Sequence, residues 1–461
     1  MASASGVSPL ARLRGLKASP ARILMGGASA VILLGTLLLS LPQASATGVR
    51  IGFVDALFTA TSAVCVTGLI VLDTPTEMST FGHVVLLFLF QVGGLGYMTS
   101  ATFVAAVLGR RVGLRNRLVL KEAMASPTME GLLRFATLTV KVTLVVEGLI
   151  ALVLAARFAT RMEPGQALWY GVFHSVSAFN NAGFALFSDS LGGFRNDPLV
   201  IVSIMVALVI GGLGFLVLSD LERLFKGEVK RLSLHSRLTL WMSLWVGVVG
   251  AVLLLLIETS TGGPLADAAG LGQHAELALF QSMTARTAGF AIIDMSFLSI
   301  PALYLTIMLM MVGGGSGSTA GGIKVTTMGV VLASLWSTLR GRERVSIFYR
   351  TVPQSIVQKS FFLAFMAFFL VTGVTWLVLL LEDSRFMPTL FEVASAVATV
   401  GLSIGDGAGR SFCAGFGDSG KLLVALCMFI GRLGPLTIGI AVLKTEHQQH
   451  YRRPEERVLI G

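Results

Sequence analysis

Four short runs of this sequence combine a serine, threonine or asparagine with small residues and end on a glycine, at intervals of roughly 110 residues. Glycine accepts backbone angles that other residues avoid, so such a run can turn successive carbonyl oxygens toward one side. Carbonyls arranged around an axis can replace the water around a cation. The residues predicted to supply these oxygens are Cys65, Val66, Thr67 and Gly68; Asn180, Asn181, Ala182 and Gly183; Arg286, Thr287, Ala288 and Gly289; and Ala398, Thr399, Val400 and Gly401.

A second glycine motif follows each run inside a long apolar stretch, with the sequence GGLG, GGLG, GGGS or GRLG. Small residues also recur because transmembrane helices pack closely through them, and this is the alternative interpretation of any single copy. Four copies with the same order of the two motifs favour a fourfold internal repeat. The runs are therefore predicted to form one selectivity filter, to which each repeat contributes a loop.

The third repeat departs from this pattern, because its second motif extends into a long series of small residues. Glycine is less favourable than alanine in a helix by about 1 kcal/mol, so this segment is predicted to be unwound. Below the filter it would act as a gate, and a tolerated kink in a packed helix is the alternative. The predicted gating residues are Gly313, Gly314, Gly315, Ser316, Gly317, Ser318, Thr319, Ala320, Gly321, Gly322, Lys324 and Arg432.

Two ionisable residues lie within apolar stretches. Arg432 occupies the second position of GRLG, which is the second motif of the fourth repeat. A buried arginine needs oxygen partners. Carbonyls of the unwound segment are expected to supply them, and an electrostatic barrier in the pore is the other role considered. Glu147 is either a functional group or a structural one that faces the interior of the bundle.

Enzymatic and nucleotide-binding chemistry is not supported by the motifs present. Residues 315–320 fit a dinucleotide-binding pattern, but no strand precedes them. Residues 415–421 nearly match a phosphate-binding loop, but the position after the lysine is a leucine. No spacing of nucleophile and base, or of metal ligands, is apparent. The sequence therefore predicts no catalytic residues and no cofactor in this chain.

Composition and charge distribution indicate a membrane protein. The 461 residues are 54% hydrophobic and only 13% charged, which excludes an ordinary soluble protein. The net charge of +10 comes from basic clusters near both ends and between the repeats, while most acidic residues lie in the other loops. This positive-inside pattern predicts a multi-pass protein with both termini in the cytoplasm. Because the pattern accounts for the positive net charge, no nucleic-acid partner is predicted.

Each repeat is predicted to contain a spanning helix, a half-helix too short to span, a filter loop and a second spanning helix. The expected fold class is an all-α polytopic membrane protein with eight spanning helices around a central pore. The spans are predicted at Ile23–Leu41, His83–Leu108, Leu132–Phe158, Leu199–Phe225, Leu238–Ile257, from Pro301, Ser360–Leu381 and Leu422–Leu443. The half-helices are expected to begin near Asp55, Pro164, Gln273 and Pro388.

These elements divide the chain into six predicted segments. They are a cytoplasmic N-terminal tail (1–21), four pore repeats (22–121, 122–231, 232–350 and 351–444) and a cytoplasmic C-terminal tail (445–461). For the first apolar run, a signal peptide cleaved after Ala46 is the alternative. Cleavage would leave the first repeat without the helix that the other three have, which favours a retained span.

The runs VTGL, NNAGF, RTAGF and TVGLSIG, the glycine-rich segment of the third repeat and Arg432 together resemble the Trk/Ktr/HKT superfamily of potassium transporters, and within it the Ktr membrane subunits. The resemblance implies that the four run-ending glycines select K⁺ and that the unwound segment and Arg432 form a gate. Sodium-selective relatives carry serine at the position of Gly68, so the glycine present here argues against sodium selectivity.

The resemblance also implies the location and partners of the protein. It implies a homodimer in a bacterial cytoplasmic membrane that binds a cytosolic ring of nucleotide-binding subunits, which bind ATP and ADP. It further implies that transport often depends on Na⁺. The predicted function is therefore potassium uptake. A Na⁺-selective or Na⁺-coupled transporter of the same fold is the alternative, and a transporter with inverted repeats is disfavoured because all four repeats run in parallel.

Overall fold

The structure is a computed structural model that describes residues 20–96, 132–265, 270–434 and 437–439. Within these residues the chain is helical except for one short β-hairpin and the connecting loops. Several predicted segments lie outside the described residues. They are most of the N-terminal tail, the basic stretch after the first repeat, the C-terminal tail and the predicted ends of the second and last spans.

The same order of elements occurs four times: an outer helix, a shorter pore helix and an inner helix. The outer helices are α2 (Pro20–Leu39), α8 (Leu132–Phe158), α12 (Leu234–Thr261) and α16 (Gln354–Leu381). The pore helices are α3 (Phe53–Cys65), α9 (Pro164–Phe179), α13 (Leu271–Thr284) and α17 (Phe386–Ala398). The inner helices are α5 (Thr80–Leu95), α10 (Pro198–Leu213), α14 (Ile300–Met311) and α18 (Asp418–Leu433).

Shorter elements connect or extend these helices. They are η1 (Pro42–Ala44), α4 (Thr74–Glu77), η2 (Gly192–Phe194), α11 (Phe215–Phe225), η3 (Met295–Phe297), α15 (Val325–Leu339), β1 (Ser346–Ile347), β2 (Arg350–Thr351) and η4 (Phe412–Gly415). Strands β1 and β2 form an antiparallel hairpin in which Ser346 pairs with Thr351. The hairpin follows α15 and is an exception to the predicted all-α fold.

The four outer helices are long and apolar enough to cross a membrane, and α10 with α11 makes a fifth candidate if the bent pair is counted as one span. The prediction of one continuous span from Leu199 to Phe225 is wrong, because the chain bends by 96° between α10 and α11. Gly214, between the two helices, has a φ of +96° and ends α10. The remaining inner helices are shorter within the described residues, so the count of eight spans stays a prediction.

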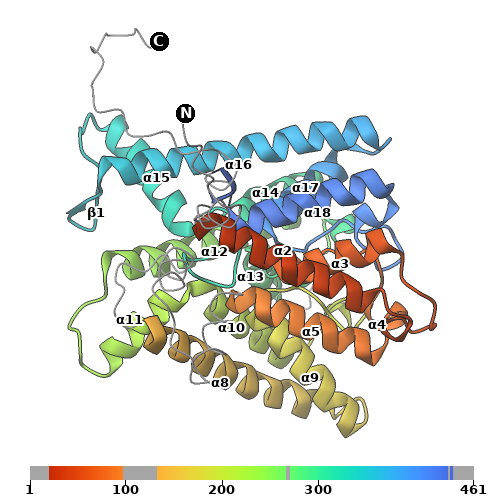
Figure 1. Ribbon diagram of the computed structural model, residues 1–461. Helices are drawn as coiled ribbons and strands as arrows, with labels where there is room; N and C mark the ends of the chain where they lie inside the picture. The colour runs from red at the N-terminus through yellow and green to blue at the C-terminus, as the bar shows by residue number, and fades with distance from the viewer. Residues whose placement is uncertain (1–19, 97–131, 266–269, 435–436, 440–461) are drawn as a thin grey trace, which may run out of the picture.

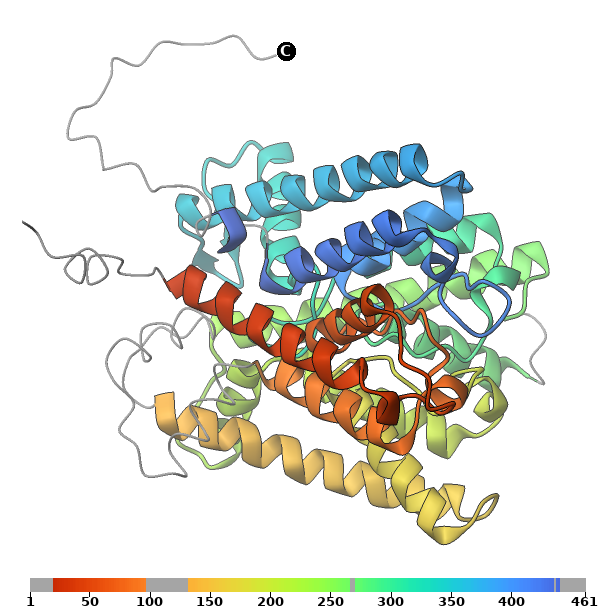
Figure 2. The same ribbon diagram turned by 45° about the vertical axis from the view of Figure 1, so that its right-hand side comes forward.

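The outer helices present apolar side chains at the surface. Helices α16 and α8 lie at opposite edges of the molecule in both views (Figures 1 and 2), and α3 and α13 lie between them in Figure 1. Exposed side chains on these edges include Leu152 of α8 and Phe365 and Trp376 of α16. Apolar faces of this kind suit the hydrocarbon interior of a bilayer, where every backbone group must be paired within a helix.

Polar contacts between helix ends fix the inner helix against the outer helix in the second, third and fourth repeats. Glu258 of α12 accepts hydrogen bonds from the N–H and hydroxyl of Ser299 at 3.2 and 2.8 Å, at the start of α14. Glu382, at the end of α16, accepts from two N–H groups at the start of α18, at 3.1 and 3.2 Å. In the second repeat an ion pair of 2.6 Å joins Arg157 to Asp197. Carboxylates are favourable at helix N-termini, where N–H groups lack partners.

The four repeats close into a ring. Helix α18 of the fourth repeat packs against α3 of the first. At this contact the Nζ of Lys421 lies 2.7 Å from an Oδ1 of Asp55, in the first turn of α3. The first and last repeats are therefore neighbours, and the ends of all four pore helices can approach one centre.

Candidate functional site

Each filter loop contains two residues with positive φ, one of them two positions before the run-ending glycine and the other that glycine itself. The first set has φ values of 56°, 58°, 75° and 51° at Val66, Asn181, Thr287 and Thr399. The glycines have φ values of 91°, 72°, 78° and 95° at Gly68, Gly183, Gly289 and Gly401. Valine and threonine are rare at positive φ, so the surroundings must hold these residues there. The four loops share one backbone geometry.

The four glycines stand in a closed ring. A Cβ atom added to any of them would lie between 2.1 and 3.1 Å from a carbonyl oxygen of the next loop. The pairs are Gly68 with Ala182, Gly183 with Ala288, Gly289 with Val400, and Gly401 with Thr67. Each carbonyl belongs to the residue just before a glycine, and the last pair returns to the first loop. A side chain at any of these positions would have to displace the neighbouring loop, and the positive φ also favours glycine at each of them.

Hydroxyl side chains hold the loops in two ways. In the first and fourth repeats, Ser62 and Ser395 accept hydrogen bonds from the N–H of the run-ending glycine at 3.1 and 3.0 Å. In the second and third repeats, Ser177 and Thr284 donate to the carbonyl of the residue after the glycine, both at 2.7 Å. These four residues were not among the predicted site residues. Their shared signal is a hydroxyl about six positions before each glycine.

Two long polar side chains of the runs turn away from the ring. Asn180 donates to Gln91 at 2.7 Å and to Glu147 at 3.0 Å. Arg286 donates to the carbonyl and hydroxyl of Ser243, in α12, at 2.7 and 3.2 Å. Both side chains therefore hold their loops to neighbouring helices. Glu147 thus has partners that position a filter loop, and Gln91 and Ser243 are site residues that the sequence did not single out.

In the first, second and fourth repeats, the second glycine motif joins the inner helix to the pore helix. A Cβ atom added to its first glycine would lie 2.1, 1.8 or 2.0 Å from a carbonyl oxygen at the end of the pore helix. The pairs are Gly93 with Val64, Gly211 with Phe179, and Gly431 with Val397. Each carbonyl lies four residues before the run-ending glycine, so the inner helix braces the base of the filter loop. This is the close backbone approach that the motif predicts.

The segment predicted to gate the pathway lies between α14 and α15. It contacts filter loops two and four, which are diagonal in the ring. In the second loop, Asn181 donates a hydrogen bond to the hydroxyl of Thr319 at 2.7 Å. In the fourth loop, a Cβ atom added to Gly321 would lie 1.8 Å from the hydroxyl oxygen of Thr399. The segment therefore crosses the ring on the side where the filter loops begin.

Two cations hold the segment in this position. Arg432 donates from one guanidinium nitrogen to the carbonyl of Thr319 and from the other to the carbonyl of Gly93, in α5. The Nζ of Lys324 donates to the carbonyl of Ala320 at 2.6 Å. Arg432 thus ties the segment to the inner helices of the first and fourth repeats. The gating role assigned to these residues remains a prediction.

Comparison with known proteins decides the family. The family model for TrkH, described as a cation transport protein, matches residues 28–453. The chain belongs to the TrkH family. The resemblance inferred from the sequence is thereby confirmed, and this family consists of transporters and not of enzymes.

Individual relatives of this TrkH-family protein extend over nearly its whole length. The chain is 38% identical to the Ktr system potassium uptake protein B of Vibrio alginolyticus, over 96% of each chain. It is 34% identical to the protein of the same name from Bacillus subtilis, over 97% of this chain and 98% of the relative. The potassium/sodium uptake protein NtpJ of Enterococcus hirae is 34% identical, over 96% of this chain and 97% of the relative.

A solved structure in the same family has a similar fold. The crystal structure of the potassium transporter TrkH from Vibrio parahaemolyticus matches with a TM-score of 0.69 and 20% identity, and it covers 91% of this chain and 85% of that one. At this identity the match establishes the fold alone. The helical membrane architecture of the TrkH family therefore applies to this chain.

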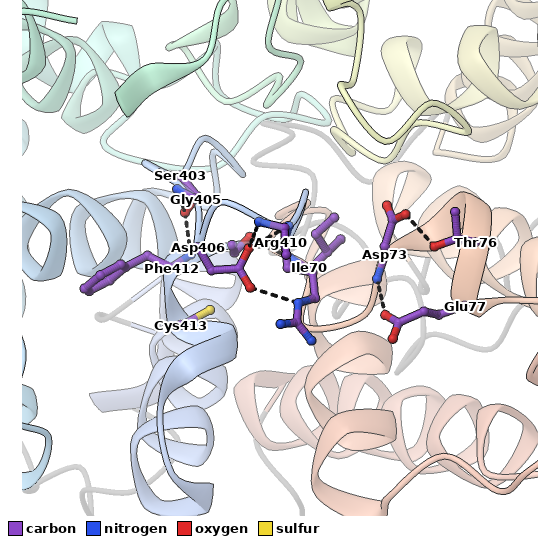
Figure 3. Close-up of polar contacts among 12 residues, drawn as sticks. Ile70, Asp73, Thr76, Glu77, Ser403, Gly405, Asp406, Arg410, Phe412 and Cys413 are labelled. Carbon is purple, nitrogen blue, oxygen red and sulfur yellow. Dashed lines mark hydrogen bonds and ion pairs between the residues drawn. The ribbon is translucent and has the colours of Figure 1, made fainter. Parts of the chain in front are cut away.

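On the opposite side of the ring from the crossing segment, the first and fourth filter loops are joined. The N–H of Ser411 donates to the carbonyl of Ile70 and the N–H of Ile70 to the hydroxyl of Ser411, both at 2.9 Å. Nearby, Asp406 pairs with Arg410 at 2.9 Å (Figure 3). Partial burial raises the pKa of Asp406, but hydrogen bonds from Ala408 and Arg410 and the Arg410 charge outweigh this and leave the pKa below its usual value.

Proposed function

We propose that this protein carries potassium ions into the bacterial cell across the cytoplasmic membrane, through a filter lined by main-chain carbonyls. The ring of closely spaced glycines supports this proposal, because carbonyls held around one axis can replace the water around K⁺. Potassium as the cargo is supported by relatives at 38% and 34% identity that are potassium uptake proteins. Each of the four runs retains its glycine, as the resemblance to potassium-selective transporters requires.

The gate in this proposal is the segment of residues 313–322. The observation that carries it is the pair of contacts on diagonal filter loops, through Thr319 on one side and Gly321 on the other. A backbone that joins two diagonal loops of a fourfold ring must pass across its axis. Ions leaving the filter would meet this backbone, so the segment has to move for transport to proceed.

The wider architecture follows from the same proposal. Eight spans in four repeats would surround one pore, with both termini in the cytoplasm. A homodimer that binds a cytosolic ring of ATP- and ADP-binding subunits is supported by similarity to proteins of the Ktr system. No cofactor is assigned to this chain, and K⁺ is its cargo.

Deletion of residues 314–321 tests the gate. Uptake of ⁸⁶Rb⁺ should be measured in cells that lack their own potassium uptake systems and in vesicles that contain the purified protein alone. We expect the deletion to raise flux in both, because it removes an obstruction and not a packed helix. Unchanged or lower flux in a variant that reaches the membrane at the normal level would contradict the gate and favour a structural kink.

A sodium-selective or sodium-coupled transporter of the same fold is the second candidate. It is favoured by the 34% identity to a potassium/sodium uptake protein. Uptake of ²²Na⁺, and the dependence of ⁸⁶Rb⁺ uptake on external Na⁺, separate the candidates. Potassium uptake through this filter predicts weak competition by Na⁺, whereas a sodium carrier should transport ²²Na⁺ directly.

A further inference from the structure

We propose that the gating segment also sets the ion selectivity of the filter, through the hydrogen bond between Asn181 and Thr319. This inference rests on the proposed function, in which residues 313–322 form the gate. It assigns Thr319 as a positioning residue for the second filter loop. Movement of the gate would then change how well the filter distinguishes K⁺ from Na⁺.

Thr319 lies where four parts of the molecule meet. Its hydroxyl accepts from the side chain of Asn181 at 2.7 Å and donates to the carbonyl of Phe179 at 3.2 Å. Its N–H donates to the carbonyl of Gly211, in α10, at 3.3 Å, and its own carbonyl accepts from Arg432. Thr319 is 1% exposed, so water does not replace these partners while the segment is in place.

The two hydroxyl contacts bracket the start of the second filter loop. Phe179 is the last residue of pore helix α9, and Asn181 is the residue with a φ of 58° in that loop. Asn181 is also 1% exposed, and the next residue, Ala182, supplies the carbonyl that meets Gly68 in the ring. Thr319 therefore supports the backbone that presents one carbonyl of the filter.

Opening of the gate must break this support. Residues 313–322 cannot leave the axis while the hydroxyl of Thr319 stays on Asn181 and Phe179. The amide of Asn181 then loses a buried partner, and a buried donor without a partner is costly. Since coupling between two sites is reciprocal, an ion that favours the ordered filter would also favour the closed segment.

Substitution of the hydroxyl alone tests this coupling. Thr319→Val keeps a branched side chain but cannot accept from Asn181, whereas Thr319→Ser keeps the hydroxyl. Thr36→Val is the matched control, because Thr36 is also 1% exposed and its hydroxyl donates to the carbonyl of Ile32 within α2, at 2.9 Å, away from the filter loops and the gate. The first measurement determines the K⁺ concentration and the Na⁺ concentration that each halve ⁸⁶Rb⁺ uptake, and their ratio gives the preference for K⁺. The second measures the binding of K⁺ and of Na⁺ to the purified protein by thermal shift.

Thr319→Val removes the hydrogen bonds to Asn181 and to Phe179, and the coupling rests on the shorter one, to Asn181. We expect the variant to reduce the preference for K⁺ on the order of threefold, a change within the range of one ordinary hydrogen bond. Thr319→Ser and Thr36→Val should keep the wild-type preference. Asn181→Gly, which tolerates positive φ but has no amide, should reproduce the loss, and its combination with Thr319→Val should add nothing more. Additive losses, or an unchanged preference in Thr319→Val, would overturn the coupling.

The deletion of residues 314–321 separates this inference from the gate itself. If coupling operates, the deletion raises flux and also lowers the preference for K⁺ to the level of Thr319→Val. Raised flux with the wild-type preference would overturn the coupling and leave the gate standing. Flux that does not rise would remove the gate, while the binding ratio of Thr319→Val would still report on the support of the filter.

Discussion

Replacement of Gly211 by alanine tests whether the inner helices brace the filter. The added Cβ would lie 1.8 Å from the carbonyl oxygen of Phe179, so α10 or the end of α9 must move by more than about 1 Å. Overpacking of this kind costs about 1–3 kcal/mol, and we expect the upper end because the clash is with a backbone atom. The same shift would disturb the filter loop that begins after Phe179, so K⁺ uptake should fall with stability.

The assay compares thermal unfolding in detergent and ⁸⁶Rb⁺ uptake for this variant and a matched glycine-to-alanine control. Gly373, in α16, has no heavy atom within 4 Å of an added Cβ. Alanine is the better helix former by about 1 kcal/mol, so Gly373→Ala should be neutral or stabilising. If Gly211→Ala behaves like Gly373→Ala in both measurements, close approach of α10 to the pore helix is not what the GGLG motif provides.

Three further predictions concern the ring and its two sides. In Gly68→Ser, the Cβ would lie 2.5 Å from the carbonyl oxygen of Ala182, so the variant should have a lower preference for K⁺ over Na⁺. Competition of Na⁺ with ⁸⁶Rb⁺ uptake measures this preference, and an unchanged preference would argue against the filter assignment. Arg432→Gln should raise uptake. Its effect should be less than additive with that of the deletion of residues 314–321, because both changes remove the contact between Arg432 and Thr319, and full additivity would separate Arg432 from the gate. Asp406 has a lowered pKa, so its carboxylate stabilises the fold above about pH 4 and this contribution is lost as pH falls through the lowered pKa. The loss of thermal stability in Asp406→Asn should therefore be smaller in acid than at neutral pH. An equal loss at all pH values would show that the charge of Asp406 does not provide this stability.

The shared geometry of the four loops could be predicted from the sequence, because each run ends on a glycine that has a positive φ and a close neighbouring backbone. Their role as a filter stays a prediction. The four runs, the starts of the pore helices and the unwound segment all carry local signals of this kind. The bend after α10 was missed even though Gly214 marks it, because a glycine inside an apolar stretch fits close packing as well as a break. The last glycine of the second motif also ends α5, at Gly96, and α18, at Gly434. This glycine therefore marks the end of the inner helix in three of the repeats.

Other features could not be read from local sequence at all. The hairpin turns at Phe348 and Tyr349, with φ values of 48° and 63°, positions where asparagine and glycine are the usual signal. The guanidinium of Arg237 lies over the Phe348 ring, 4.5 Å from its centroid, so the hairpin depends on a distant part of the chain. The partners of Asn180 and Arg286 likewise come from other helices, and their selection depends on the packing of the whole ring.

The third repeat lacks the brace found in the other repeats, which is what the proposed gate requires. In the other repeats, the first glycine of the second motif packs on a carbonyl at the base of a filter loop. The nearest atom to an added Cβ at Gly313 is the carbonyl oxygen of Gly321, at 2.0 Å, which belongs to the segment itself. The third repeat has thus exchanged a contact between helix and filter for one within its own loop. Residues 313–322 can therefore rearrange without removing a brace of this kind, and their remaining attachments to the filter are the contacts of Thr319 and Gly321, which opening must break.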